Sequence, residues 1–585
     1  MDLPKLLRTW SEHWSLRLML LGVVVGVLAG GVVLLFRVAI GEAAYWVTLG
    51  EGFAGLPAWA RLLLPAAGGL IVGLLASFVF PRHSDVGVSR VLEQVAYGAS
   101  QLGARSAMAQ FLFGVIAIGS GHSVGREGPS IHMGAAIGSQ VGQYLRIDPD
   151  HLRILVAAGA AGAFAGALNI PLAGVVFALE VILGEYTLIL FAPVVVSAVL
   201  ATVVAQMGGG RGVVLDVPQV ATHPLPLLPL DWVIGLGAAL MSFFLLRGLE
   251  GVYHLKERVA VPAWALPGLG GLAVGLLAVV APGIMGVSYG LLEDVFAGSL
   301  TLMAMTGLLV AKLAATTISL GTQSRGGAIG PSLFMGALLG AILAEVARAV
   351  VPMEVGSTAI WAIIGMAAGM AAILNAPFSA IVAVFELVQN PAVILPVMLA
   401  TVTAAVTSRD WFKAQSVFAW TLHLRELSEP ALPESGQKCT IPVNEVMVTD
   451  FRTLPLRATH EELEKAQADS GIQAAFPVSD EEAEFLGLVD LTGLLQAGLV
   501  APDEEGLIDL GPYLHRAEDL RNLYPGDGAV KAMDLMASYG LQGFPVRSPR
   551  DAAVVVGLVN RNEVVEACMD QMRDNHQEQE TGIDV

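Results

Sequence analysis

Cysteine is almost absent from this 585-residue chain and occurs only at Cys439 and Cys568. Their spacing matches no metal-binding motif, and no HExxH sequence occurs, so the sequence does not indicate zinc chemistry. The simplest inference is that the region around these two residues is reduced and lies in the cytoplasm.

Charged residues are also few, at 14% of the chain, and basic residues are the scarcer kind, with 32 Lys and Arg against 51 Asp and Glu. Residues 437–585 alone hold 27 acidic and 11 basic side chains, a net charge of −16, whereas the whole chain carries −19. The acidity therefore belongs to a soluble C-terminal region, and it argues against nucleic acid as a partner.

Apolar residues make up 55% of the chain, and the mean hydropathy of +0.67 is too high for an ordinary soluble protein. A helix needs about 20 apolar residues to cross a bilayer. Apolar runs of that kind occur near residues 18–40, 60–80, 230–246, 262–282 and 390–406. The runs at 107–119 and 129–143 are short or interrupted by Gly and Pro, which points to positions inside the protein.

Basic residues at Lys5, Arg8 and Arg17 precede the first apolar run. That run is too long for a signal peptide and has no obvious cleavage site. We therefore expect a multi-pass protein of the inner or plasma membrane, with both termini in the cytoplasm.

A fourteen-residue segment occurs twice: GREGPSIHMGAAIG at 125–138 returns as GAIGPSLFMGALLG at 327–340, with eight identities. GVS at 87–89 likewise returns at 286–288, and LNIP at 168–171 returns as LNAP at 374–377. Three matches in one order indicate a duplicated unit rather than chance similarity of Gly- and Ala-rich stretches. In an apolar chain, such duplication is typical of transporters and channels built from two halves.

Each long match places glycine and proline where a helix would begin, at Gly128-Pro129 and Gly330-Pro331. Proline suits a first helical turn, and glycine allows the backbone to approach an ion closely. Helix N-termini carry free N–H groups and roughly +0.5 of an elementary charge, so they can replace part of the hydration of an anion. Two inverted halves would bring these ends together near the membrane midplane.

The first of these turns carries Glu127, and the second has Ile329 at the matching position. A carboxylate among helix N-termini can occupy the anion site until a mobile anion or a proton displaces it, and it would then act as a gate. The alternative is that Glu127 only pairs with Arg126 at a structural turn. An ionisable residue inside a membrane favours the functional interpretation.

Beyond the apolar region, short β-branched strands alternate with amphipathic helices. AAFPVSD and FLGLVD in one module are followed in the same order by GFPVRSP and VVGLVN in the next. This pattern resembles a pair of CBS domains.

GREGP at 125–129, GGAIGP at 326–331 and the paired C-terminal modules together resemble the CLC family of chloride channels and proton-coupled chloride exchangers. The resemblance covers nearly the whole chain. It implies an all-α, polytopic, inverted-repeat membrane fold with broken helices, followed by a small α/β CBS pair. It also implies a homodimer with a separate pore in each subunit, chloride as the transported ion and Glu127 as the gating residue. Backbone amides at Arg126, Gly128, Ala328 and Ile329 would line the anion path.

The chain departs from the family at three positions. Where the family has a serine and a tyrosine around the central anion, this sequence has Val86 and, most plausibly, Phe418, with Trp420 as the other candidate for the tyrosine. Where exchangers have a second glutamate for protons, it has Val181. Such a site should depend more on backbone amides and hold chloride less tightly, and it lacks the inner proton relay.

These features predict passive chloride or anion conduction through a channel gated by Glu127 and modulated by the CBS pair. The nearest alternative is a proton-coupled anion exchanger on the same fold, with Glu180 accepting protons; otherwise Glu180 and its counterpart Glu386 are structural caps or ion-pair partners. A more distant alternative, a CBS-containing divalent-cation transporter, would need several converging carboxylates. No enzyme is predicted, because GHSVG at 121–125 lacks the α/β context of a hydrolase.

CBS pairs often bind adenine nucleotides through a hydroxyl and an acid after the second strand. The corresponding residues here are Asp490 and Gly493 in one module, and Asn560 and Glu563 in the other. Only Glu563 is suited to a ribose, and Asp490 would repel phosphate. A dimerising, gate-modulating tail is therefore expected ahead of a nucleotide site, and no cofactor is required.

The predicted organisation has seven parts. They are an amphipathic lead at 1–16, a transmembrane domain at 17–425 with repeats at 17–207 and 230–407, a linker at 426–442, modules at 443–498 and 516–568 joined by 499–515, and a polar tail at 569–585.

Overall fold

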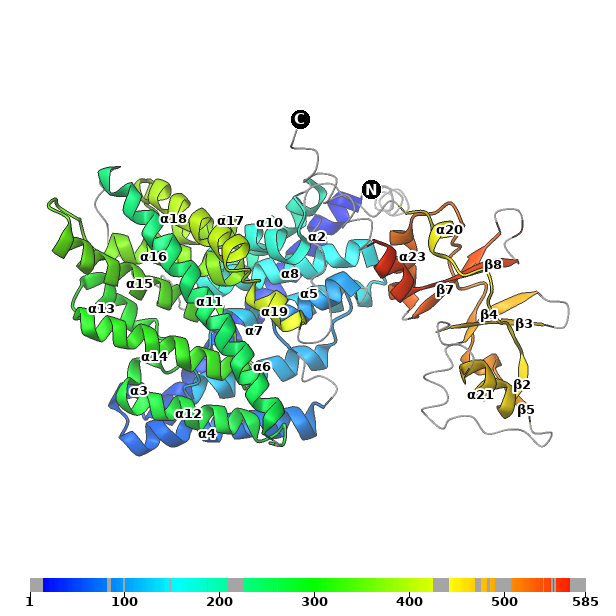
Figure 1. Ribbon diagram of the computed structural model, residues 1–585, viewed down its shortest axis with the longest axis horizontal. Helices are drawn as coiled ribbons and strands as arrows, with labels where there is room; N and C mark the ends of the chain where they lie inside the picture. The colour runs from blue at the N-terminus through cyan, green and yellow to red at the C-terminus, as the bar shows by residue number, and fades with distance from the viewer. Residues whose placement is uncertain are drawn as a thin grey trace, which may run out of the picture. The chain divides into compact units, whose positions relative to one another are not determined.

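The computed structural model forms two compact units, Met1–Ala96 with Ser100–Leu432, and Pro433–Val585 with Tyr97–Ala99. It describes residues 14–81, 86–97, 100–147, 149–186, 188–208, 225–259, 261–423, 441–468, 475–480, 484–489, 507–539, 541–548, 551 and 554–568. The first unit is helical and the second contains the strands (Figure 1).

The first unit consists of helices of very unequal length. Its first half contains α2 (Trp14–Thr48), α3 (Gly52–Gly55), α4 (Ala58–Leu74), α5 (Val88–Tyr97), α6 (Ala104–Gly119), α7 (Glu127–Tyr144), α8 (Pro149–Leu168), α9 (Pro171–Phe177) and α10 (Leu188–Met207). Its second half contains α11 (Leu228–Arg258), α12 (Leu266–Val280), α13 (Gly290–Ala297), α14 (Leu302–Gly321), α15 (Ile329–Val350), α16 (Thr358–Leu374), α17 (Pro377–Val388), α18 (Ile394–Val406) and α19 (Val417–His423). Helices α4, α9 and α18 continue into the π-helical turns η1 (Leu75–Val79), η2 (Ala178–Leu183) and η6 (Thr407–Trp411).

Eight helical segments of the described chain are long and apolar enough to cross a membrane. They are Leu16–Gly55, Ala58–Val79, His151–Leu168, Leu190–Met207, Leu228–Lys256, Leu302–Gly321, Ile329–Val350 and Pro391–Trp411. The apolar run at 262–282 forms only the 15-residue helix α12, because the chain turns before Leu266 and Pro267 begins the helix. It is too short to be one of the eight.

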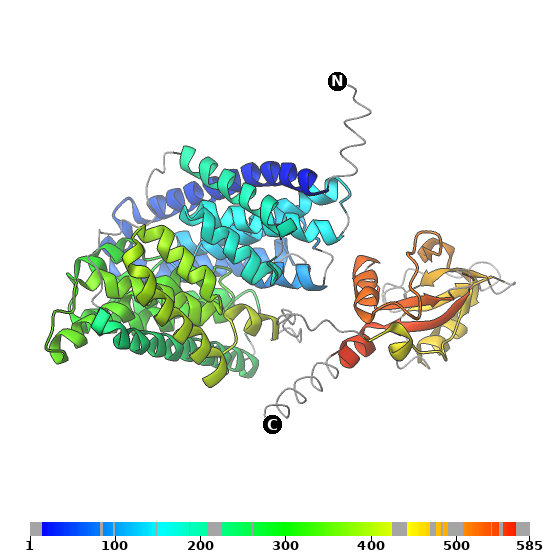
Figure 2. The ribbon, with the colours of Figure 1, turned by 90° about the horizontal axis from the view of Figure 1, so that it is seen from above.

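The two sequence copies fold alike. Helix α7 packs on α8 and α2 on α10 in the first copy, and α15 packs on α16 and α11 on α18 in the second. Seen from above in Figure 2, the first copy (blue to cyan) and the second (green to yellow) lie side by side. Pairs that join the copies include α4 with α12 and α9 with α17. The duplication read from the sequence is thus a structural repeat.

The matched LNIP and LNAP segments have the same backbone course. Helices α8 and α16 end before Asn169 and Asn375, which adopt left-handed conformations with φ of 62° and 53°. Pro171 and Pro377 then begin α9 and α17. Asparagine tolerates the left-handed region better than most residues, and proline is favoured at a first turn, so the motif breaks a helix and starts another.

The second unit contains short strands and helices. They are α20 (Val443–Val446), β1 (Leu454–Pro455), β2 (Arg457–Thr459), α21 (His460–Ala468), β3 (Phe476–Ser479), β4 (Phe485–Val489), β5 (Leu507–Asp509), β6 (His515–Arg516), α23 (Ala529–Tyr539), β7 (Gly543–Arg547) and β8 (Val555–Asn560). Thr459 and Glu462 cap α21 reciprocally, and the Thr459 N–H holds the pKa of the Glu462 carboxyl below its usual value.

Two equivalent hairpins form the centre of the tail. Strands β3 and β4 pair antiparallel, as do β7 and β8, and each pair has a register shift at the same place, after Val478 and after Val546. The modules are intertwined, because Val448 at the start of the tail bridges Leu558 of the second hairpin, and β6 pairs with β4 of the first. This small α/β region follows the helical unit as predicted.

Some predictions fall outside the described residues. These are the first thirteen residues of the amphipathic lead, most of the linker at 426–442, Asp490 and Gly493, and the tail at 569–585. The prediction of reduced cysteines is wrong for Cys568, which is buried and disulfide-bonded. The spacing of the two cysteines in the sequence excluded a metal-binding motif, but it does not show which cysteines the fold brings together in a disulfide. Cys439 lies outside the described residues.

Candidate functional site

The two repeated glycine turns meet in the interior of the helical unit. Gly125 and Gly327 exchange backbone hydrogen bonds, with N···O distances of 2.7 and 2.9 Å. A Cβ atom added to Gly128 would lie 2.9 Å from the Cα of Gly327, so glycine is required by the close approach of the two chains. Since α7 begins at Glu127 and α15 at Ile329, the N-termini of two equivalent helices lie against each other.

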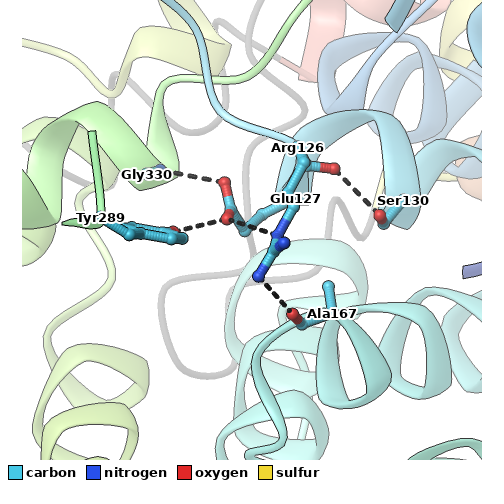
Figure 3. Close-up of polar contacts among 6 residues, drawn as sticks. All are labelled: Arg126, Glu127, Ser130, Ala167, Tyr289 and Gly330. Atoms are coloured by element: carbon cyan, nitrogen blue, oxygen red, sulfur yellow. Dashed lines mark hydrogen bonds and ion pairs between the residues drawn. The ribbon is translucent and has the colours of Figure 1, made fainter. Parts of the chain in front are cut away.

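Glu127 lies at this junction and is fully buried. Its carboxylate accepts hydrogen bonds from two groups of the second copy: the Tyr289 hydroxyl donates to Oε1 at 2.6 Å, and the Gly330 amide donates to Oε2 at 3.1 Å (Figure 3). The Gly330 N–H belongs to the first turn of α15, where backbone donors have no partner within the helix. The carboxylate thus occupies a position suited to an anion.

Arg126 lies beside the carboxylate without enclosing it. Its Nε is 3.9 Å from Glu127 Oε1, at the limit of an ion pair, and it donates through Nη2 to the Ala167 carbonyl at 3.4 Å. Its guanidinium lies over the Tyr289 ring, 5.6 Å from the ring centroid. The shorter contacts of Glu127 are therefore those to the second copy, which favours the site interpretation over a local pair with Arg126.

Tyr289 is the residue of this group that the sequence motifs do not predict. It directly follows the segment 286–288 that matches 87–89, so its place after a repeated segment was the available signal. In the first copy the matching position is Arg90, which pairs with Glu93 instead. The contact between Tyr289 and Glu127 joins residues 162 apart in sequence, and only the fold reveals it.

A buried lysine fixes the loop that carries Tyr289. Lys312 on α14 is fully buried, and its Nζ donates to the carbonyls of Ile284 and Gly286 at 3.0 and 2.9 Å and to Ser288 Oγ at 2.8 Å. Ser288 Oγ in turn donates to the Gly283 carbonyl at 2.7 Å. This network holds the backbone immediately before Tyr289.

The other predicted residues belong to two different packing clusters. Ala328 caps α15, Ile329 begins it, and both are buried in the main core cluster, which also contains Phe418 of α19. Val86 packs in a separate cluster against α4 and α6. The segment of Val86 reaches the junction through Val88, which lies 4.0 Å from a Cβ placed on Gly128.

Glu180 and Glu386 form a reciprocal pair of helix caps. Glu180 accepts hydrogen bonds from the Phe378 and Ser379 amides and from the Ser379 hydroxyl at the start of α17. Glu386 accepts from the Leu172 and Ala173 amides at the start of α9, at 2.8 and 2.7 Å. Each copy thus caps a helix of the other, and Val181 beside Glu180 is buried.

Comparison with known proteins identifies the family. A family model described as voltage gated chloride channel matches residues 68–409. A ClcB-like protein of Ralstonia nicotianae is 32% identical over 400 residues, covering 66% of this chain and 92% of the relative. An "H(+)/Cl(-) exchange transporter ClcA" of Vibrio vulnificus is 30% identical over 414 residues, covering 66% of this chain and 86% of the relative.

Solved structures show the same fold. A eukaryotic CLC transporter aligns with a TM-score of 0.66 and 20% identity, over 94% of this chain and 98% of its own. A slow cyanobacterial Cl⁻/H⁺ antiporter aligns with a TM-score of 0.62 and 22% identity, over 72% of this chain and 99% of its own. With its repeated helices and meeting glycine turns, the chain is an integral, multi-pass membrane protein and belongs to the CLC family, whose members are chloride channels and transporters and not enzymes.

Proposed function

We propose that this protein conducts chloride and similar small anions passively through the junction of α7 and α15, with Glu127 as the gate. One observation carries the proposal: the Glu127 carboxylate accepts hydrogen bonds from an α15 amide and from a tyrosine hydroxyl of the opposite copy. Those donors would serve a mobile anion equally well. The gate is closed while the carboxylate occupies the site and opens when protonation or a competing anion displaces it.

The backbone supplies most of the proposed anion path. Amides around Arg126–Gly128 and at Ala328 and Ile329 belong to the first turns of α7 and α15 or to the residues before them. Removing a charge from water into a bilayer costs at least about 2.5 to 3.5 kcal/mol, and a favourably placed helix end returns up to about 2 kcal/mol. Two helix ends are therefore enough to hold an anion weakly, as conduction requires.

Val86 and Phe418 shape the selectivity of the proposed path. Neither side chain offers a hydroxyl to an anion, so the positions where the family has serine and tyrosine contribute only apolar surface. We expect chloride to bind less tightly here than in family members that have both hydroxyls.

Passive conduction is favoured by the surroundings of Glu180. Both of its carboxylate oxygens already accept hydrogen bonds at the start of α17, and the next residue is Val181. A carboxylate used as a cap is poorly suited to carry protons, because each protonation would weaken the cap. The name of the ClcB-like relative, which describes a chloride channel protein, agrees with this assignment.

Proton-coupled exchange is the second candidate. It is favoured by the Vibrio vulnificus relative, whose name describes a proton/chloride exchanger. Glu127 and Glu180 would then form the proton path.

Proteoliposomes separate the two candidates. Purified protein is reconstituted, a chloride gradient is imposed, and the internal pH is followed together with chloride efflux. Passive conduction predicts chloride efflux without uphill proton movement. Uphill proton pumping in fixed proportion to chloride would replace the channel assignment with the exchanger.

The face formed by α9 and α17 supports a homodimer. With its continuation η2, α9 runs over Pro171–Leu183, and α17 has 12 residues, so both helical segments are too short to cross a bilayer. Leu172 and Phe378 at their starts are 47% and 63% exposed. Helix ends inside a bilayer must be covered by protein or water, and a second copy of the chain would cover this face. Light scattering in detergent should give twice the mass of one chain.

The intertwined hairpins of the tail support a CBS pair that modulates the gate from the cytoplasm, where both termini would lie. Glu563 is the proposed ribose contact if the pair binds an adenine nucleotide. In this structure Glu563 instead accepts a hydrogen bond from the Asn560 amide at 3.4 Å, next to β8. We therefore assign the tail a structural and regulatory role first.

A further inference from the structure

We propose that Tyr289 is the hydroxyl ligand of this anion site: it holds the Glu127 carboxylate when the gate is closed and donates to the mobile anion when the gate is open. This proposal rests on the proposed function and extends it, because it assigns a specificity-determining side chain. Neither sequence motif of the site contains Tyr289.

The geometry places the hydroxyl, the amide and the carboxylate around one point. A Cβ atom built on Gly330 would lie 3.0 Å from Glu127 Oε2 and 3.2 Å from the Tyr289 hydroxyl. Both donors therefore face the same small volume, which the carboxylate now fills. If the carboxylate leaves, the Gly330 N–H and the Tyr289 O–H remain aimed at the vacated space.

The hydroxyl stays in place because its supports do not depend on Glu127. Lys312 fixes the carbonyls of Ile284 and Gly286 and the hydroxyl of Ser288, just before the tyrosine. Arg126 covers one face of the tyrosine ring. Such a preorganised donor avoids reorganisation when an anion enters.

Tyr289 also accounts for a missing part of the site. Val86 and Phe418 carry no hydroxyl, yet hydroxyl donors make short, strong hydrogen bonds to ionised acceptors. A tyrosine from the loop before α13 provides one such donor from another direction. Because a hydroxyl binds small, strongly hydrated anions best, Tyr289 should favour chloride over larger anions.

The charged and titratable groups near Glu127 limit how its release depends on pH. Arg126 lies beside it, Tyr289 donates to it, Arg37 of α2 acts electrostatically on Arg126, and Lys312 lies behind the tyrosine loop. Arg126, Arg37 and Lys312 all stay in place in a tyrosine variant. A change of pH response on removing the hydroxyl can therefore be assigned to the hydrogen bond.

The test uses full-length protein in proteoliposomes, with chloride and thiocyanate flux measured against pH for Tyr289→Phe, Glu127→Gln and the double variant. In Tyr289→Phe, the closed gate loses a hydrogen bond to its ionised form, so protonation releases it at higher pH. We expect the midpoint of the pH response to rise by about one unit. Tyr144 lies at the C-terminal end of α7 and is 88% exposed. Tyr144→Phe is therefore the matched control and should behave as wild type.

The Glu127→Gln background isolates the second role, because its gate no longer responds to pH. In that background, adding Tyr289→Phe should lower the ratio of chloride flux to thiocyanate flux by roughly fivefold. A change of this size corresponds to the loss of about one hydrogen bond to the anion. Unchanged pH midpoint and unchanged anion ratio would overturn the proposal. Absence of anion flux in every protein, wild type included, would instead refute the proposed function. If Tyr289→Phe does not fold, Tyr289→Asn, whose amide is too short to reach Glu127, has the same expected outcomes.

Discussion

In the proposed mechanism, a single carboxylate determines whether the anion site is occupied. Glu127 is fully buried, and an unpaired charge at that depth would be costly. Its two hydrogen bonds come from the second copy, and the Arg126 guanidinium lies 3.9 Å away. These contacts hold the carboxylate in the position proposed for the anion.

Glu127→Gln should abolish the pH dependence of anion flux. The amide has nearly the same size but no charge. Only its oxygen can accept a hydrogen bond, so it cannot accept from both the Tyr289 hydroxyl and the Gly330 N–H, and it competes weakly with a mobile anion. We expect flux that no longer falls as external pH rises, measured as chloride efflux from proteoliposomes. Glu345→Gln, at a partly exposed residue that pairs with Arg348, is the control. A Glu127→Gln protein that retained the wild-type pH dependence would contradict the gate assignment.

Gly125→Ala should damage the site without unfolding the membrane unit. Its Cβ atom would lie 2.4 Å from Glu127 Oε2 and 2.9 Å from the Gly330 amide nitrogen, so the carboxylate must leave its position. We expect anion flux to fall at least several-fold at every pH, because the added methyl group also lies against the Gly330 amide that would hold the mobile anion. Gly31→Ala is the control for adding a methyl group to the same unit, because a Cβ atom at Gly31 would have no other atom within 4 Å. Equal flux in both variants would argue against the tight junction described above.

At the scale of helices, the reciprocal caps join the two copies. Glu180 caps α17 and Glu386 caps α9, so each short helix depends on a carboxylate of the opposite copy. A carboxylate that accepts backbone N–H groups at a helix start stabilises it through both hydrogen bonding and the helix dipole. The pair therefore explains why equivalent glutamates stand in the two repeats.

Glu386→Gln and Glu180→Gln should each lower the free energy of unfolding by about 1 to 2 kcal/mol, measured by thermal unfolding in detergent. Neither should alter the pH response of anion flux, since that response belongs to Glu127. Glu250→Gln removes an exposed carboxylate paired with Arg247 and should be nearly neutral. If Glu180→Gln instead changed proton movement while stability stayed constant, the cap would be a proton acceptor, and the exchanger would be favoured.

The sequence predicted features that depend on local patterns. Glycine and proline at 128–129 and 330–331 predicted the helix starts, and the repeat predicted that those starts would be equivalent. Tyr289 and Lys312 were not predictable in the same way, because their roles depend on a tertiary approach between copies. The disulfide at Cys568 was missed for a similar reason, since cysteine spacing does not report which residues the fold brings together.

The division of the tail into modules was limited in the same way, because contacts between distant segments cannot be predicted from local sequence patterns. The hairpins β3–β4 and β7–β8 follow from strand patterns in the sequence. The bridge between Val448 and Leu558 does not, because it joins the beginning of one module to the hairpin of the other. A linear division at 443–498 and 516–568 therefore describes the modules as separate, whereas the structure intertwines them.

At the scale of the whole molecule, the proposed anion site is complete within one chain. Glu127 comes from the first copy, and Tyr289 and Gly330 come from the second copy of the same polypeptide. A homodimer would therefore contain two separate sites, and neither would require a residue from its partner. Their gates should then respond to pH independently.

Mixed dimers test that independence. Wild-type and Glu127→Gln chains with different affinity tags are co-expressed, and dimers carrying both tags are purified and reconstituted. If each subunit gates alone, alkaline chloride flux should be about half that of the Glu127→Gln homodimer, because independent sites contribute additively. The remaining flux, from the wild-type subunit, should appear only as pH falls. A mixed dimer with wild-type or fully mutant pH dependence would instead mean that the two subunits share one gate, and the intrachain site could not be the whole mechanism.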